Sequence, residues 1–247
     1  MQEKKQQAPQ QAQQEVKVTE DFNKNIKDLG LVILIVAVAG WALFKYDSRN
    51  ENNNSNNQTK EQTMEKPAIK QVEKPTKEEA AKYDAIADKK IVVIETNKGV
   101  IKAKLYAKDA PYTVASFMKL IENGLYDGLI FHRVIAGFMI QGGDPYGNGT
   151  GGPGYKFDDE LNAKTVSYKA GYKKGVLAMA NSGPNTNGSQ FFIMLEDYQL
   201  PKNYTIFGKV TVGQEVVDAI GKVATDKSND KPLEDVKITK VYLEDVK

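Results

Sequence analysis

An arginine and a glutamine, Arg133 and Gln141, stand inside an otherwise apolar run of this chain. The run reads FHRVIAGFMIQGGD over residues 131–144. Side chains alternate between the two faces of a strand, so Arg133 shares a face with Phe131 while His132 takes the opposite face. An arginine held against an apolar surface needs a polar partner, and Gln141 is a candidate because its amide oxygen accepts from a guanidinium. We interpret His132 as structural.

A second ordered motif, AMANSGPNTNGSQFFI, occupies residues 178–193, and IFGKV follows at residues 206–210. Together with residues 131–144, these motifs closely resemble the cyclophilin family of peptidyl-prolyl cis-trans isomerases. The resemblance extends from about residue 90 to the C-terminus. It implies a mainly β fold, a closed eight-stranded antiparallel β-barrel with two α-helices. It also implies an enzyme that uses no cofactor and no metal.

By position in these motifs, the resemblance makes Arg133 the catalytic residue and Gln141 the residue that orients it. The other implied contacts are Phe138, Met139, Phe192 and Leu200 around the proline ring, Tyr204 at the rim, and Ala180, Asn181 and Gln190 along the substrate backbone. Gln199 stands where a tryptophan often precedes the pocket leucine, which predicts weaker binding of cyclosporin-like inhibitors.

Such a site needs no nucleophile, because rotation about a peptide bond breaks no covalent bond. Resonance creates a barrier of about 18 to 20 kcal/mol, and X-Pro bonds exchange slowly between two populated isomers. A catalyst must favour the twisted amide, in which the lone pair localises on the prolyl nitrogen. The permanently charged, planar guanidinium of Arg133 suits this task. The sequence therefore predicts isomerisation of X-Pro bonds in proline-containing polypeptides.

The elements that must position these residues lie within residues 89–247, which we expect to be one isomerase domain. Amphipathic spacing predicts helices from Pro111 to a stop at Gly124 and over residues 214–220. Strands that directly follow strands favour a closed antiparallel sheet over a βαβ fold. The predicted strands occupy residues 91–96, 100–106, 129–135, 138–141, 176–180, 191–195, 205–210 and 236–243.

Composition narrows the possible partners of the 247-residue chain. Its 34 basic and 32 acidic residues leave a formal net charge of +2, which gives no global field suited to nucleic acid. The chain has no cysteine and one histidine, so it contains no disulfide, and no cluster of metal ligands is visible. We expect a monomer.

The first 88 residues are more polar than the rest. Residues 1–28 are rich in Gln, Lys and Glu and bury too little apolar surface to order the chain, so we expect a disordered tail. Residues 47–88 are rich in Asn and then in Lys and Glu. We expect a disordered linker there, in which residues 77–87 could form a helix.

Between them, residues 29–46 are almost entirely apolar and predict a single transmembrane anchor. As a helix they would span about 27 Å at 1.5 Å per residue, close to the hydrocarbon core of about 30 Å. Five lysines precede the run and weakly favour a cytoplasmic N-terminus, which places the C-terminal domain outside the cell membrane. A cleaved signal peptide, with Ala37-Val38-Ala39 as its cleavage pattern, and a buried soluble helix remain alternatives.

Other classes of function fit the sequence less well. Gly147, Gly149 and Gly152 have the spacing of a dinucleotide fingerprint, but no helix follows them, so we interpret the segment as a loop beside the substrate groove. A proline-peptide binding module without turnover has no need for Arg133. An assembly scaffold would work through the linker, in which no repeat or binding motif is found.

Overall fold

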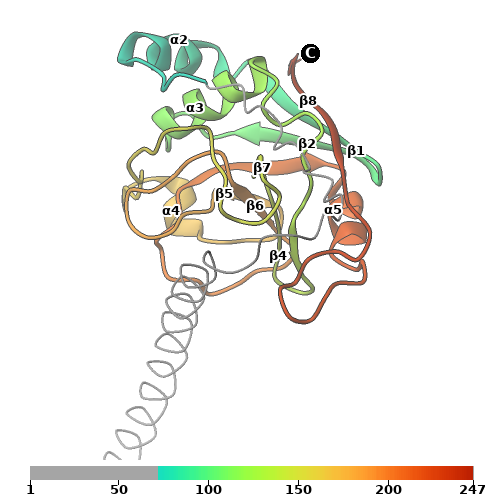
Figure 1. The fold of residues 1–247 in the computed structure, drawn as a ribbon. Helices are drawn as coiled ribbons and strands as arrows, with labels where there is room; N and C mark the ends of the chain where they lie inside the picture. The colour runs from blue at the N-terminus through green and yellow to red at the C-terminus, as the bar shows by residue number, and fades with distance from the viewer. Residues whose placement is uncertain (1–71, 247) are drawn as a thin grey trace, which may run out of the picture. The chain divides into compact units, whose positions relative to one another are not determined.

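Eight strands form one antiparallel sheet in the computed structural model, which describes residues 72–246 (Figure 1). Every strand pair is antiparallel, and the order across the sheet is β3-β4-β6-β5-β7-β2-β1-β8. A strand occurs in each of the eight predicted segments. The strands are β1 (Lys90–Thr96), β2 (Gly99–Leu105), β3 (Arg133–Ile135), β4 (Met139–Gly142), β5 (Val176–Met179), β6 (Phe191–Met194), β7 (Ile206–Val212) and β8 (Ile238–Asp245).

The sheet curls without closing, so the closed barrel expected from the sequence is wrong. The end strands β3 and β8 share no ladder, and an isolated bridge joins Ile130 to Lys237 near their ends. Most of the predicted strand at 129–135 is irregular, although the backbone N–H of Phe131 donates to the carbonyl of Val236 at 2.9 Å. Because β3 keeps only three strand residues, its edge is too short to pair along β8.

Residues 72–246 contain four helices, although the sequence predicted two for the domain. The two predicted ones are α3 (Pro111–Glu122) and α5 (Gln214–Ile220), and the additional ones are α2 (Lys77–Ala87) and α4 (Val166–Ala170). Helix α3 begins with a proline, whose fixed φ suits the first turn, and most of its residues are buried. Five-residue α4 is too short to leave a periodic pattern in the sequence.

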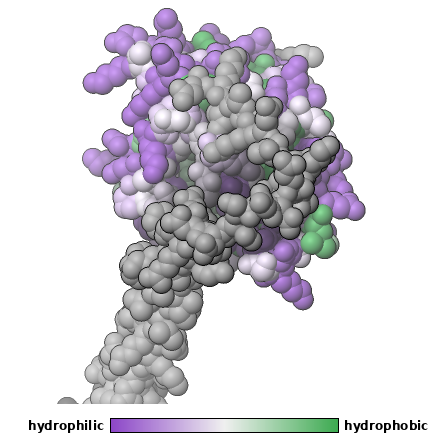
Figure 2. Space-filling view, in the orientation of Figure 1, coloured by the Kyte–Doolittle hydropathy of each residue, from purple (hydrophilic) through white to green (hydrophobic). Residues whose placement is uncertain are grey.

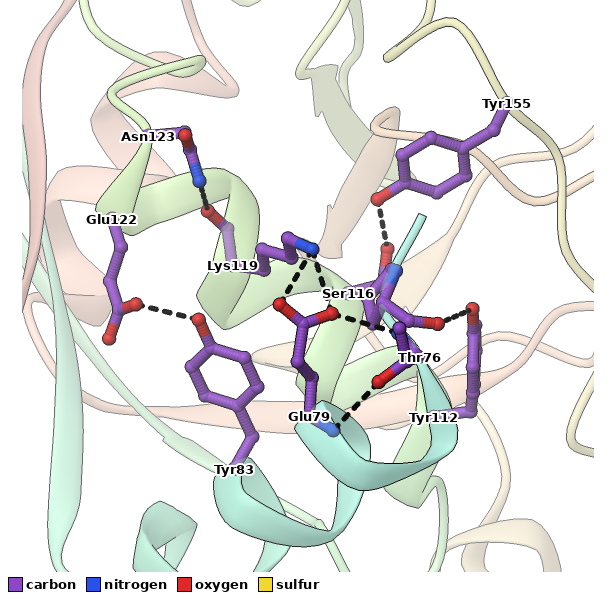
Figure 3. A network of polar contacts seen from close by, with 10 residues as sticks. Thr76, Glu79, Tyr83, Tyr112, Ser116, Lys119, Glu122, Asn123 and Tyr155 are labelled. Atoms are coloured by element: carbon purple, nitrogen blue, oxygen red, sulfur yellow. Dashed lines mark hydrogen bonds and ion pairs between the residues drawn. The ribbon is translucent and has the colours of Figure 1, made fainter. Parts of the chain in front are cut away.

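Helix α2 corrects the disordered linker predicted up to residue 88, because its polar residues are ordered by hydrogen bonds. Thr76 and Glu79 form a reciprocal capping box at its start. The carboxylate of Glu79 also accepts from Nζ of Lys119 on α3 at 2.9 and 3.0 Å, and the hydroxyl of Tyr83 donates to Glu122 at 2.6 Å (Figure 3). The folded unit therefore extends at least to residue 72.

Two separate apolar clusters pack on the sheet. The large cluster contains Phe117 of α3, Phe191 of β6 and Phe207 of β7, and the ring centroids of Phe117 and Phe207 lie 4.9 Å apart. The small cluster consists of Met139, Tyr172, Val176, Ala178, Phe192, Met194 and Ile206. Strand β6 contributes to both, because Phe191 belongs to the large cluster and the next residue, Phe192, to the small one. This alternation puts apolar side chains on both faces of the strand.

The tail predicted at residues 1–28, the anchor at 29–46 and the linker up to residue 71 lie outside the described residues. No helix within residues 72–246 has the length and hydropathy to cross a membrane. Figure 2 shows the described part of one face as mostly hydrophilic, with small separate hydrophobic spots.

Candidate active site

A cavity of about 200 Å³ is built on the small cluster. Its lining contains every predicted site residue except Gln190, which lines an adjoining cavity of about 700 Å³ together with Gln141, Ala180 and Asn181. The fold therefore brings the predicted residues to one place from β3, β4 and β6, from the turn between β3 and β4, and from the loops after β5 and β6. The residues of the smaller cavity, called the proline pocket below, are Arg133, Phe138, Met139, Gln141, Ala180, Asn181, Phe192, Leu200 and Tyr204.

The apolar side of the proline pocket is rigidly supported. Met139 and Phe192 are buried beneath it, and the ring of Tyr204 stands edge-on to Phe192 with 5.6 Å between centroids. The hydroxyl of Tyr172 donates to the Tyr204 carbonyl at 3.0 Å and accepts from its N–H at 3.1 Å. Burial raises the pKa of Tyr172 to about 12. The sequence did not single out Tyr172.

Phe138 forms the outer apolar wall with a residue that the sequence analysis also missed. Its ring lies 4.7 Å from that of Tyr198, measured between centroids, at an interplanar angle of 46°. Tyr198 is half exposed, whereas Phe138 is partly buried. Packing against Tyr198 therefore limits the movement of the Phe138 ring.

Arg133 extends from β3 at the polar side of the pocket. It lies directly opposite Gln141 across the β3–β4 ladder, so the two predicted partners are neighbours. However, its Nε donates to Oδ2 of Asp230 at 3.3 Å, and this carboxylate rather than Gln141 is its hydrogen-bond partner. The side chain remains 44% exposed, and Arg133 is among the residues that line the cavity.

Asp230 is positioned by the loop before β8. It has a positive φ of 61°, and its N–H donates to the Asp226 carbonyl at 2.8 Å. Its own carbonyl accepts from the N–H of Val134 at 2.9 Å, so backbone and side chain of Asp230 both hold β3. Asp230 lies 97 positions from Arg133, and no local pattern in the sequence could have linked them.

Gln141 instead belongs to a chain of amide hydrogen bonds. Its Nε2 donates to Oε1 of Gln190 at 3.0 Å, and Nε2 of Gln190 donates to the carbonyls of Gly149 and Gly151, both at 2.9 Å. The two carbonyl acceptors fix which end of the Gln190 amide is nitrogen. The Gln141 amide is thereby oriented with its oxygen as the end that accepts hydrogen bonds.

The glycine-rich loop that accepts the hydrogen bonds of Gln190 is folded around the buried carboxylate of Asp144. That carboxylate accepts from the backbone N–H groups of Tyr146, Asn148 and Gly149. A Cβ at Gly151 would lie 2.0 Å from Oδ1 of Asp144, so only glycine allows this approach. The segment is a loop, as predicted, and its residues 149–156 line the larger cavity.

Asn181 joins two loops at the edge of the pocket. Its Nδ2 donates to the carbonyl of Asn203 at 2.9 Å, and its Oδ1 accepts from the N–H of Gly183 at 3.3 Å. The neighbouring Ala180 donates its N–H to the Gln190 carbonyl at 2.9 Å. The side chain of Asn181 is therefore occupied in holding the loops, which leaves its backbone as the group for a substrate contact.

His132 lies next to Arg133 but is buried, and neither ring nitrogen has a hydrogen-bond partner. Burial holds the pKa of His132 below its ordinary value, and the charge of Arg133 lowers it further while Asp144 opposes this. The ring is neutral at neutral pH, in keeping with a structural residue. Within residues 72–246, no three acidic or histidine side chains gather into a possible metal site.

Known proteins share both sequence and fold with this domain. Residues 91–243 match the family model described as cyclophilin type peptidyl-prolyl cis-trans isomerase/CLD. Peptidyl-prolyl cis-trans isomerase B of Streptomyces anulatus is 46% identical, over 64% of this chain and 99% of its own. The mouse protein peptidyl-prolyl cis-trans isomerase-like 1 is 49% identical, over 61% of this chain and 90% of its own.

A solved structure extends the agreement to three dimensions. A cyclophilin type peptidyl-prolyl cis-trans isomerase of Cryptosporidium parvum, crystallised in the presence of the dipeptide Ala-Pro, is 38% identical with a TM-score of 0.56. The alignment covers 63% of this chain and 99% of that one. Family model, relatives and fold agree over the part that carries the proline pocket. The chain therefore belongs to the cyclophilin-type peptidyl-prolyl cis-trans isomerases.

Proposed function

We propose that this isomerase acts on X-Pro bonds of exported or cell-surface polypeptides and assists their folding, held to the membrane by residues 29–46. The observation that carries the isomerase part is the proline pocket, which is lined both by apolar side chains and by the partly exposed Arg133. The apolar slot suits a proline ring, and the guanidinium suits a hydrogen bond to the nitrogen of that ring. No cofactor is needed, because the reaction changes only a torsion angle.

The chemical step follows from this arrangement. Met139 and Phe192 fix the proline ring, so rotation occurs at the carbonyl group that precedes it. In the planar amide the nitrogen lone pair is delocalised and accepts poorly, whereas in the twisted amide it is localised. A hydrogen bond from Arg133 to that nitrogen therefore strengthens towards the transition state and lowers the barrier.

Two sets of contacts prepare Arg133 for this task. Asp230 binds Nε, which leaves the two terminal nitrogens of the guanidinium for the substrate. The oriented oxygen of Gln141 lies on the neighbouring strand, where it accepts from a terminal nitrogen when the guanidinium turns towards the substrate. We therefore assign Asp230 and Gln141 as positioning residues.

Nuclear magnetic resonance exchange spectroscopy of an Ala-Pro peptide tests the activity. The chain should accelerate cis-trans exchange far above the uncatalysed rate, which is one event in tens to hundreds of seconds. A protein that bound the peptide and left its exchange rate unchanged would be a binding module.

The membrane location rests on the apolar run at residues 29–46 and the polar stretch that separates it from the domain. Carbonate extraction and protease treatment of intact cells test it. We expect the protein to stay with the membrane and its domain to be cleaved from outside. A soluble mature form that begins near Gly40 would instead support a cleaved signal peptide.

A further inference from the structure

A second recess, of about 400 Å³, shares no lining residue with the proline pocket. Its walls are the end of β2 with the following residues 106–109, helix α4, the start of β5 and the first half of β7. We call it the lysine groove. Its lining consists of Asp88, Lys104, Leu105, Tyr106, Ala107, Lys108, Asp109, Val166, Ser167, Ala170, Gly171, Lys173, Val176, Ile206 and Lys209.

The floor of the lysine groove is apolar. Val176 and Ile206 belong to the small cluster, and Leu105 and Ala107 belong to the large one. At the rim, Val166 in the first turn of α4 is 79% exposed. An apolar group bound in the groove would cover both the floor and Val166.

Charges of mainly one sign surround this floor, since four lysines and two aspartates line the groove. Both aspartates are engaged. Asp109 accepts from the N–H of Ser167 at 2.8 Å, and Asp88 pairs with Lys108 at 3.7 Å. Lys173 pairs with Asp197, outside the lining, at 2.9 Å.

The two remaining lysines, Lys104 and Lys209, lie directly opposite each other on β2 and β7. Neither forms an ion pair with any residue between 72 and 246. Like charges directly opposite in an antiparallel pair destabilise it. Lys209 already helps to lower the pKa of the Asp197 carboxyl, whereas no carboxylate pairs with Lys104 within residues 72–246. A further carboxylate placed between the two ammonium groups would attract both and offset their repulsion.

We propose that the lysine groove binds an extended polypeptide segment in which an acidic residue neighbours a large aliphatic one. The carboxylate meets Lys104 and Lys209, and the aliphatic side chain lies on Val176 and Ile206 beside Val166. The recess favours a peptide over other anions. A free phosphate would leave the apolar floor uncovered, and a bilayer surface would meet the lysines without entering the recess.

If the proposed function holds, the segment belongs to the polypeptide whose X-Pro bond is isomerised. Binding at two places on one chain raises the effective concentration of the proline at the catalytic pocket. The groove would thus select substrates by a sequence distant from the proline. Binding of the segment itself does not depend on catalysis, so the two proposals are tested separately.

The test uses a fluorescein-labelled, proline-free peptide, Ala-Leu-Glu-Leu-Asp-Ala, and the full chain in fluorescence anisotropy titrations. The Lys104→Gln/Lys209→Gln double variant should raise Kd about fivefold, as expected for the loss of two exposed ion pairs. Val166→Ser should raise Kd about threefold, because it removes apolar contact without changing charge. The matched control, Lys77→Gln/Lys98→Gln, alters two exposed lysines outside the groove by the same net charge.

Equal weakening in the two double variants would overturn the proposal, because attraction would then follow net charge alone. An unchanged Kd in Val166→Ser, or equally strong competition by inorganic phosphate or by phosphatidylglycerol vesicles, would also overturn it. Exchange of a short uncharged Ala-Pro peptide is measured in parallel and should be unchanged in Lys104→Gln/Lys209→Gln. If the unaltered chain did not accelerate exchange of the Ala-Pro peptide but still bound the acidic peptide, the proposed function would be contradicted and the proposal for the lysine groove would not.

Discussion

The large and the small apolar cluster share strands β4, β5, β6 and β7 but differ in what covers them. The large cluster is covered by α3 and by the curled sheet, and its aromatic rings are almost fully buried. The small cluster is covered only in part, and its uncovered members line the proline pocket. Similar residue types therefore stabilise the fold on one face of the sheet and form a binding surface on the other.

This difference shows why apolar runs on both faces of a strand do not by themselves indicate a fully buried sheet. Residues of β6 are buried in succession, yet Phe192 reaches the pocket and Phe191 does not. Substitutions that distinguish stability from catalysis follow directly from this division.

The largest effect is expected for Phe207→Ala in the large cluster. Phe207 is fully buried and packs on Phe117, so its truncation should lower the free energy of unfolding by about 3 to 5 kcal/mol. Phe192→Ala should cost clearly less stability but should raise KM for an Ala-Pro peptide. Urea unfolding and exchange kinetics measure the two quantities. Equal losses of stability in both variants would remove the distinction between the clusters.

Arg133→Ala should lower kcat/KM by about 10² to 10³, the usual cost of removing one preorganised donor, with the fold intact. Arg133→Lys should recover little, because an ammonium lacks the planar fork. Exchange kinetics and circular dichroism check both variants. Near-normal exchange in a natively folded Arg133→Ala protein would disprove the proposed chemistry.

Removing residues 72–88 should destabilise the large cluster without changing the small one. Val72 and Ala87 are buried in the large cluster, and burial of one valine contributes about 1.5 to 3 kcal/mol. A shortened chain that starts at residue 89 should therefore unfold at lower urea than one that starts at residue 72. Their KM values should agree. Identical unfolding midpoints would mean that α2 contributes nothing to stability.

Asp230→Asn should lower kcat by about three- to tenfold and leave KM unchanged, since the neutral amide still occupies the site but binds the guanidinium more weakly. Combined with Arg133→Ala, it should have no further effect, because Asp230 acts through that arginine. Asp230→Glu, which keeps the charge, should lose less activity than Asp230→Asn. Additive losses in the double variant would indicate a role for Asp230 outside catalysis.

The smallest expected effect is the contribution of His132 to the pH dependence of folding stability. Burial lowers its pKa in the folded protein, so below the ordinary value of about 6.5 the unfolded chain takes up a proton that the folded chain does not. Stability should therefore fall as the pH drops from 7 towards 5. His132→Gln should show a shallower fall in the same urea titrations, while the carboxylates common to both proteins contribute equally. Parallel curves would exclude this contribution.

The sequence predicted local features well. Alternating runs located all eight strands, and the proline and glycine at the ends of α3 located that helix. The ordered motifs also named the residues of the proline pocket, because their types and order are tied to one fold. The prediction was weaker wherever a residue depends on a distant partner.

Asp230 and Tyr172 were missed for that reason, since each acts on a residue far away in the sequence. Helix α2 was only suggested because its stability comes from Glu79 and Tyr83 binding α3 rather than from an apolar stripe. The closed barrel was wrong because only three residues of the strand predicted at 129–135 form β3.

The gap between the end strands β3 and β8 affects amide hydrogen exchange in β3. The catalytic strand is an edge strand of three residues, paired on one side with β4 and held on the other by the loop that carries Asp230. Its amide protons exchange by local opening, at lower free energy than those of central β5 and β7. The protection of Val134 thus reports on the mobility of the catalytic arginine, while the protection of Leu177 reports on global unfolding.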